Sequence, residues 1–178
     1  MERTDTPQPF ISKSYWNAHR PHVLVVACSD GRYQKALDDF LQTSLGITDY
    51  DRMYVAGGPG ALASSSLSFF RGEQFRQDTA FLIDRHGIER VVLIFHGPLL
   101  DGGPRDAVCA DYDRKMPYAS PAEIHAQHQK DLVEVLRGMR RAKSSLSIEV
   151  FRAEVRGDHR VQFTPLAEPD DQYGRGIA

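Results

Sequence analysis

The feature that most constrains the fold of this chain is a pair of continuous apolar runs at residues 22–28 and 90–96. The first reads His-Val-Leu-Val-Val-Ala-Cys and the second reads Arg-Val-Val-Leu-Ile-Phe-His, with no alternation of polar residues inside either run. A strand that is apolar on both sides needs cover on both faces, which is typical of a parallel sheet. The two runs therefore predict buried strands with helices above and below them.

Helical spacing of apolar residues alternates with these strands. Gly46 and Gly87 close two of the predicted helices, because glycine readily takes the left-handed conformation at a helix C-terminus. The segment Ser120-Pro-Ala-Glu123 forms a capping box with proline at the first helical position, which predicts the start of a third helix. The predicted helices cover residues 33–45, 75–86 and 121–143.

Strands and helices follow one another in a regular order. Further strands are predicted at residues 53–56, 147–155 and 161–166, the last one returning after a turn at Gly157-Asp158. The order predicts an α/β fold with an open, mostly parallel β-sheet of four parallel strands plus an antiparallel edge strand, flanked by helices. We expect an N-terminal arm at 1–21, one domain at 22–166 and a C-terminal tail at 167–178, with residues 97–119 as a loop.

The composition argues against several functional classes. The 22 basic residues are spread among 24 acidic ones and the net charge is −2, so no concentrated basic face indicates nucleic-acid binding. No apolar stretch is long enough to span a bilayer, and the polar first ten residues hold two prolines and do not resemble a signal peptide. We expect no membrane contact and a cytoplasmic location. Cys28 and Cys109 are then expected to be free thiols.

Chemically versatile residues follow the predicted strands at the point where each strand ends. The first strand ends at Cys28, with Asp30 and Arg32 directly after it, and the third ends at His96. Ligands of open α/β sheets bind at the carboxyl ends of the strands, so these side chains are expected to share one rim. Cysteine and histidine are preferred zinc ligands, and an arginine can orient a carboxylate through two hydrogen bonds. The sequence therefore predicts a metal site with an Asp–Arg pair beside it.

The same residues resemble a known enzyme family. The segment Val25-Val-Ala-Cys-Ser-Asp-Gly-Arg32 resembles the Cys-x-Asp-x-Arg signature of the β-class carbonic anhydrases. The strand ending at His96 is similar to the one that delivers the family's zinc-binding histidine. Tyr54-Val-Ala-Gly-Gly58 is similar to the family's Arg-Asn-Ala-Gly-Asn segment, although the Arg and both Asn are absent. The resemblance covers the order of elements over residues 22–166.

The resemblance implies a function and a set of roles. Cys28 and His96 would bind zinc, and Asp30 and Arg32 would form the catalytic dyad. The implied reaction is the zinc-dependent, reversible hydration of carbon dioxide to bicarbonate by metal-bound hydroxide, in a homodimer or higher homo-oligomer. Two alternatives stay open: hydrolysis of carbonyl sulfide or carbon disulfide at the same site, and a non-catalytic protein with a degenerate metal site.

The third metal ligand is where this chain departs from the family. The family has a cysteine three residues after its histidine, and Leu99 occupies that position here. Cys109 is the candidate replacement, provided that the Gly-rich segment 97–112 folds back over the site. The alternative is a segment that points outward, with Cys109 away from the metal.

Other polar and aromatic residues have simpler interpretations. Asp30 could act as the N-terminal cap of the following helix, a role that is compatible with catalysis. His125 and His128 are spaced for metal binding, but their polar neighbours indicate a solvated helix face. The phenylalanines at positions 69, 70 and 75 are expected in the core or at a subunit interface. The glycines of 57–60 indicate backbone that passes close to the site.

Overall fold

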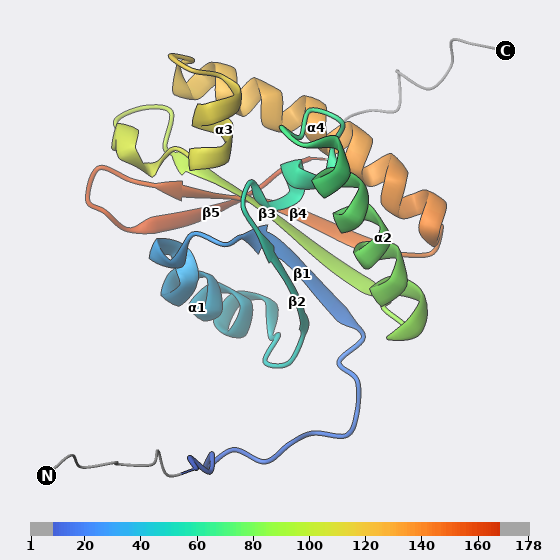
Figure 1. Cartoon of the computed structure of the whole chain (residues 1–178). Helices are drawn as coiled ribbons and strands as arrows, with labels where there is room; N and C mark the ends of the chain where they lie inside the picture. Colours follow the sequence, from blue (N-terminus) through green and yellow to red (C-terminus); the bar gives the residue numbers. More distant parts are fainter. Residues whose placement is uncertain (1–8, 168–178) are drawn as a thin grey trace, which may run out of the picture.

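Five strands form the sheet at the centre of this computed structural model, which describes residues 9–167 (Figure 1). The strands are β1 (Val23–Cys28), β2 (Asp51–Val55), β3 (Arg90–Pro98), β4 (Ser147–Val155) and β5 (Val161–Pro165). Their order across the sheet is β2-β1-β3-β4-β5. The first four run parallel, and β5 pairs antiparallel with β4. The predicted α/β fold is confirmed.

The apolar runs form the two inner strands of this sheet. Leu24 and Val26 in β1 face one apolar cluster, whereas Val25 faces a second cluster on the opposite side of the sheet. All three side chains are fully buried. Because both faces are covered, a strand at this position needs apolar residues without alternation, which explains the continuous runs.

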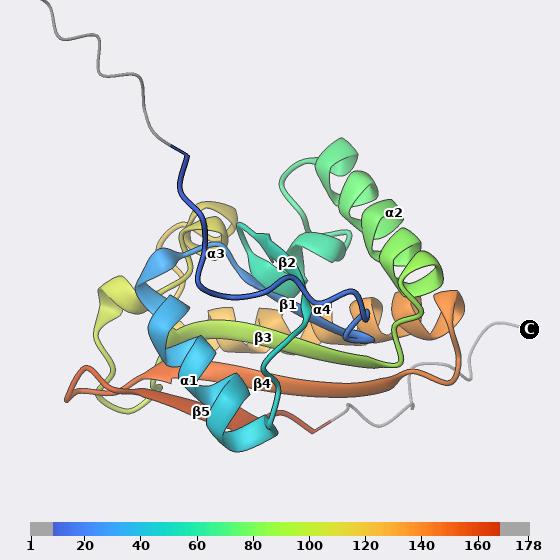
Figure 2. The ribbon, with the colours of Figure 1, turned by 90° about the horizontal axis from the view of Figure 1, so that it is seen from below.

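Helices cover both faces of the sheet, as Figures 1 and 2 show. On one face lies α1, whose Leu37 and Leu41 pack in the second cluster. On the other face lie α2 and α4, which contribute Ile83 and Leu132 to the first cluster. The helices are α1 (Gln34–Leu45), α2 (Phe69–Arg85), α3 (Ala110–Lys115) and α4 (Pro121–Ala142), with short 3₁₀ turns η1 (Gly31–Tyr33), η2 (Gly58–Leu62) and η3 (Arg105–Ala107).

Two of the predicted boundaries were wrong. Helix α2 begins at Phe69 rather than at residue 75, because the Ser68 hydroxyl caps it by accepting a hydrogen bond from the Arg71 amide. Phe69 and Phe70, expected in the core or at an interface, are 73% and 85% exposed and do not lie in the core. The segment 97–119 is not a plain loop, since it contains η3 and α3.

Helix α4 begins at the predicted capping box. The Ser120 hydroxyl accepts a hydrogen bond from the Glu123 amide, and the Glu123 carboxylate accepts one from the Ser120 amide. The prediction for His128 was wrong, because this side chain is fully buried. It lies one helical turn after Ile124 and one before Leu132, so it belongs to the apolar stripe that packs on the sheet.

The N-terminal arm does not pack on the domain over its described part. Phe10, Ile11, Tyr15 and Trp16 are each at least 87% exposed. Residues 1–8 of the expected arm and 168–178 of the expected tail lie outside the described residues. Between residues 9 and 167, no helix combines the length and apolar character needed to cross a bilayer.

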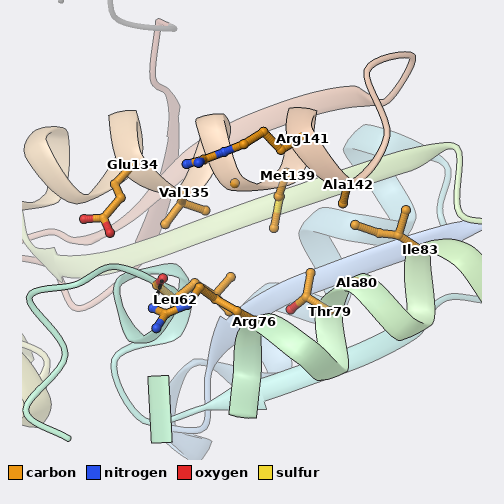
Figure 3. A pocket seen from close by; sticks show the side chains of 11 residues that line it. Leu62, Arg76, Thr79, Ala80, Ile83, Glu134, Val135, Met139, Arg141 and Ala142 are labelled. Atoms are coloured by element: carbon orange, nitrogen blue, oxygen red, sulfur yellow. Dashed lines mark hydrogen bonds between the residues drawn. The ribbon is translucent and has the colours of Figure 1, made fainter. Parts of the chain in front are cut away.

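An apolar cleft lies between α2 and α4 (Figure 3). Its charged residues have protein partners: Glu134 accepts hydrogen bonds from Ser64, and Arg76 donates to Glu73 and to the Leu62 carbonyl. The described residues that line the cleft include neither Cys nor His. The described lining therefore offers apolar packing without a thiol or an imidazole, and these two groups meet instead at the edge of the sheet.

Candidate metal centre

The strand register brings the first two predicted ligands to the same edge of the sheet. In the pairing of β1 with β3, Ala27 lies opposite Ile94. Cys28, the last residue of β1, and His96, near the end of β3, therefore follow at the carboxyl ends of neighbouring parallel strands. This is the position at which open α/β sheets bind their ligands.

A third side chain joins them from the segment after β3. The ligand atoms of Cys28, His96 and Cys109 all lie within 4.8 Å of one another. The two sulfur atoms are 3.8 Å apart, and both cysteines are free. Cys109 and His96 are only 2% and 4% exposed. The segment that carries Cys109 therefore turns inward over the rim, and the alternative in which it points outward is wrong.

The geometry and the donor types fit zinc. Two thiolates bound at the usual Zn–S distance of about 2.3 Å in a tetrahedral site lie about 3.8 Å apart, which is the separation seen here. Within residues 9–167, neither ring nitrogen of His96 has a hydrogen-bond partner, although the ring is buried. A buried polar group without a partner is costly, and a metal ion would supply one. Cys28, His96 and Cys109 could thus hold a zinc ion.

The electrostatics of the two thiols favour one negative charge on the pair. The hydrogen bond with Cys109, followed by the neighbouring His96, holds the pKa of Cys28 well below its ordinary value. The same hydrogen bond, together with burial, raises the pKa of Cys109. A single proton between the two sulfur atoms satisfies their hydrogen bond, so the pair as a whole favours one thiolate.

Asp30 and Arg32 form an ion pair beside the cluster. The Arg32 Nη2 atom lies 2.6 Å from Asp30 Oδ2, and Arg32 Nε donates to both carboxylate oxygens at 3.0 and 3.1 Å. The hydrogen bonds from Arg32 lower the pKa of Asp30, so the carboxylate is ionised at neutral pH. Asp30 also caps η1 by accepting a hydrogen bond from the Arg32 amide. The capping role and the ion pair are both present.

The glycines after β2 allow the backbone to pass behind Cys28. Gly57 and Gly58 have φ angles of +91° and +55°, a left-handed conformation that side chains disfavour. A Cβ atom on Gly58 would also lie 3.0 Å from the Cys28 amide nitrogen. The predicted close approach of this backbone segment to the site is confirmed. The positive φ angles and the contact with Cys28 explain why glycine occupies both positions.

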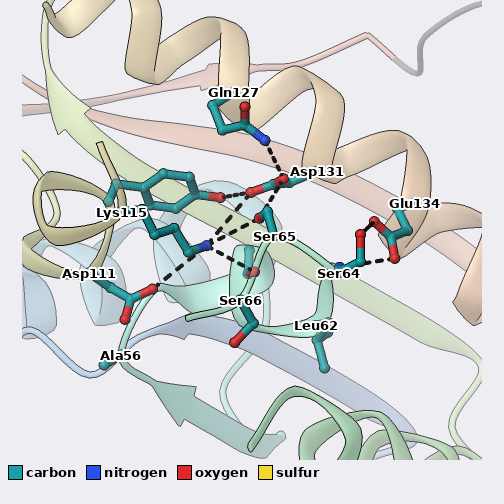
Figure 4. Close-up of polar contacts among 12 residues, drawn as sticks. Ala56, Leu62, Ser64, Ser65, Ser66, Asp111, Lys115, Gln127, Asp131 and Glu134 are labelled. Carbon is teal, nitrogen blue, oxygen red and sulfur yellow. Dashed lines mark hydrogen bonds and ion pairs between the residues drawn. The ribbon is translucent and has the colours of Figure 1, made fainter. Parts of the chain in front are cut away.

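A buried polar network anchors the short helix that follows Cys109. The Tyr112 hydroxyl donates to Asp131 on α4 at 2.5 Å. The Lys115 Nζ atom lies 3.7 Å from Asp111 and 3.9 Å from Asp131, and it donates to Ser65 (Figure 4). Because Cys109 is the N-cap of α3, this network fixes the segment that carries the third thiol. Sequence reasoning missed it, since its members lie far apart in the chain and carry no motif.

We expect Tyr112→Phe to lower the free energy of unfolding by about 1–3 kcal/mol, because it leaves the buried Asp131 carboxylate short of one donor. The midpoint of urea denaturation measures this loss. Tyr118→Phe is the matched control, since Tyr118 is 98% exposed and its midpoint should stay unchanged. Equal midpoints for Tyr112→Phe and the wild type would show that the network does not stabilise α3.

Comparison with known proteins gives matches among solved structures alone. No protein-family model and no curated protein matches this chain.

Several carbonic anhydrases are among the solved structures that match. The chain is 14% identical to the β-carbonic anhydrase CcaA, with a TM-score of 0.47, and the match covers 88% of this chain and 85% of that one. For β-carbonic anhydrase isoform I of Trichomonas vaginalis the identity is 13%, the TM-score 0.45 and the coverage 85% and 87%. For the β-carbonic anhydrase CafA of Aspergillus fumigatus these values are 15%, 0.43, 86% and 79%. The α/β fold of this chain follows from its own strand order and pairing, and the chemistry at the carboxyl ends of its strands follows from its own residues.

Proposed function

We propose that this protein is a zinc-dependent enzyme that hydrates carbon dioxide reversibly to bicarbonate. The observation that carries the proposal is the meeting of Cys28, His96 and Cys109 within 4.8 Å, beside a carboxylate held by an arginine. Neither half would suffice alone: a thiol–imidazole cluster fits a structural metal, and an Asp–Arg pair fits a helix cap. Their combination at the carboxyl ends of parallel strands favours catalysis.

Three protein ligands leave one position of a tetrahedral site for water or substrate, which is the pattern of catalytic rather than structural zinc. Cys28 and Cys109 would bind as thiolates and His96 through one ring nitrogen. Zinc in such a site supplies Lewis acidity that makes water nucleophilic near neutral pH. Cys109 would then supply the thiolate that the family pattern places at position 99, where this chain has a leucine that cannot bind metal.

Asp30 would orient the reacting water. Its carboxylate is ionised and acts as an acceptor, so it takes the hydrogen bond of a water molecule and turns the oxygen lone pair toward the carbon of CO₂. Arg32 holds both carboxylate oxygens, which keeps Asp30 in one rotamer. The Asp30 side chain is 18% exposed and that of Arg32 is 56% exposed, so solvent reaches the pair.

A small cavity lies next to the cluster. A cavity of about 10 Å³ lies against Cys28 and His96, and apolar side chains such as Leu37 and Phe163 line the rest of it. This volume is comparable to the room that one water molecule needs. Room for one water molecule does not distinguish carbon dioxide from carbonyl sulfide or carbon disulfide, so hydrolysis of these two molecules stays the alternative reaction at the same site.

The proposed enzyme acts as a homodimer or higher homo-oligomer in the cytoplasm. Exposed aromatic residues of the arm, among them Tyr15 and Trp16, support self-association, since they contact nothing within the described chain that buries them. Phe69 and Phe70 at the start of α2 add apolar surface of the same kind. A second copy of the chain is the partner that could cover these side chains.

We expect purified wild-type protein to contain about one zinc ion per chain and to accelerate CO₂ hydration, because the three ligand atoms lie within 4.8 Å of one another. Elemental analysis by mass spectrometry measures the metal. Stopped-flow mixing with CO₂ in the presence of a pH indicator measures the reaction. Folded protein that contains no zinc, and takes up none when zinc is added, would rule out the proposed function.

A further inference from the structure

Zinc-binding histidines are ordinarily held in place by a hydrogen bond from the ring nitrogen that does not bind the metal. His96 departs from this rule. Neither of its ring nitrogens has a hydrogen-bond partner within residues 9–167, so no carboxylate or carbonyl of the described chain sets the angle of its ring. The orientation of His96 must then come from the side chains that pack against it.

Tyr33 supplies that packing. Its ring lies against the His96 ring, with centroids 4.3 Å apart and planes inclined by 52°. Tyr33 is 7% exposed, and it lines the small cavity together with Cys28 and His96. Because both rings are buried, Tyr33 limits how far the imidazole can rotate.

The other end of the same side chain reaches the segment that carries the third thiol. The Tyr33 hydroxyl donates a buried hydrogen bond of 3.0 Å to the carbonyl oxygen of Ala107. Ala107 is the last residue of η3 and lies two residues before Cys109. Arg32 donates in parallel to the carbonyl of Asp106, but that contact is exposed. The tyrosine hydroxyl is therefore the buried anchor of this turn.

We infer that Tyr33 is a positioning residue for the metal site: its ring orients His96, and its hydroxyl holds Cys109 within reach of Cys28. The inference rests on the proposed zinc site and adds a residue that binds no metal itself. The two contacts can be separated by substitution. Tyr33→Phe keeps the ring and removes the hydroxyl, whereas Tyr33→Leu removes both.

The test is the rate at which zinc passes from the protein to a coloured chelator, together with the absorption spectrum of the cobalt(II)-loaded protein. Removing the outer partners of metal ligands lowers metal affinity about 10- to 100-fold. We therefore expect zinc release to be about 10-fold faster in Tyr33→Phe and up to about 100-fold faster in Tyr33→Leu. Tyr33→Leu should also shift the cobalt bands, because His96 loses its fixed orientation. Tyr33→Phe should leave these bands nearly unchanged.

Two controls separate positioning from general stability. Tyr50→Phe removes a hydroxyl that bonds Asp38 and Tyr54 away from the cluster. Phe40→Leu removes a ring of α1 that packs on Phe151 and stacks on Phe163, neither of which is a proposed metal ligand. Both should release zinc at the wild-type rate, even where Phe40→Leu lowers the melting temperature.

The outcomes are distinct. Wild-type protein that binds no metal overturns the proposed function and this inference with it. Wild-type protein that binds zinc, with Tyr33→Phe and the control variants releasing it at the same rate, overturns the inference alone. Should Tyr33→Leu fail to fold, Tyr33→Phe still decides, since it preserves the buried ring.

Discussion

Replacing Cys109 by alanine is expected to remove zinc from this protein as completely as replacing Cys28 by serine. The sulfur of Cys109 lies 3.8 Å from that of Cys28, and it is one of three ligand atoms in the cluster. Without it, one thiolate and one imidazole remain, which is fewer protein ligands than zinc sites in proteins use. Zinc content should fall from about one ion per chain to near zero in both variants.

Leu99→Ala is the matched control for this experiment. Leu99 occupies the position at which the resemblance places a cysteine, but its side chain offers no metal ligand. Its backbone amide donates a hydrogen bond to the Val155 carbonyl of β4, and substitution by alanine leaves this bond in place. The variant should therefore keep its zinc. Circular dichroism spectra should show that all three variants are folded. If Cys109→Ala keeps wild-type zinc while Cys28→Ser loses it, the three-ligand arrangement is wrong.

The sheet could be predicted because its signals are local. An uninterrupted apolar run is enough to place a strand between two helical layers, so the ends of β1 and β3 follow directly, and with them Cys28 and His96. The capping box likewise marks the start of α4 at Ser120, since both halves of the box lie within four residues. Local patterns of this kind do not depend on the rest of the chain.

The position of Cys109 depends on contacts between distant residues. Its segment is held by Arg32 and Tyr33, each bonded to a carbonyl 74 residues away in the sequence. The glycines of segment 97–112 indicated that the chain could change direction there, but they did not indicate where Cys109 would lie relative to Cys28 and His96. His128 is a similar case, because polar neighbours in the sequence hid its place on the buried stripe of α4. Such contacts become visible only once the elements are packed.

Asp30→Asn is expected to leave zinc bound and to lower the rate of CO₂ hydration by about 10²–10⁴-fold, the range typical of a lost proton acceptor. Asp30 lies outside the Cys28–His96–Cys109 cluster, so metal content should not change. The substitution removes the negative charge that faces Arg32 and replaces one acceptor by a donor. Stopped-flow assays beside zinc analysis of the same samples measure both effects.

The chain contains its own control for this second experiment. Asp158 and Arg160, in the turn between β4 and β5, repeat the Asp-x-Arg pair with the same kind of contacts: an Arg amide on Oδ1 at 3.2 Å and Nη2 on Oδ2 at 2.6 Å. Neither Asp158 nor Arg160 belongs to the Cys28–His96–Cys109 cluster. Asp158→Asn should therefore keep full activity, although it breaks the same local bonds.

If Asp30→Asn also keeps full activity, the Asp30–Arg32 pair acts as a helix cap and not in the reaction. If only Asp30→Asn loses activity and it keeps its zinc, the lost activity is due to the missing carboxylate beside the metal site. A broken Asp-x-Arg turn would not explain it, because Asp158→Asn breaks the same kind of turn.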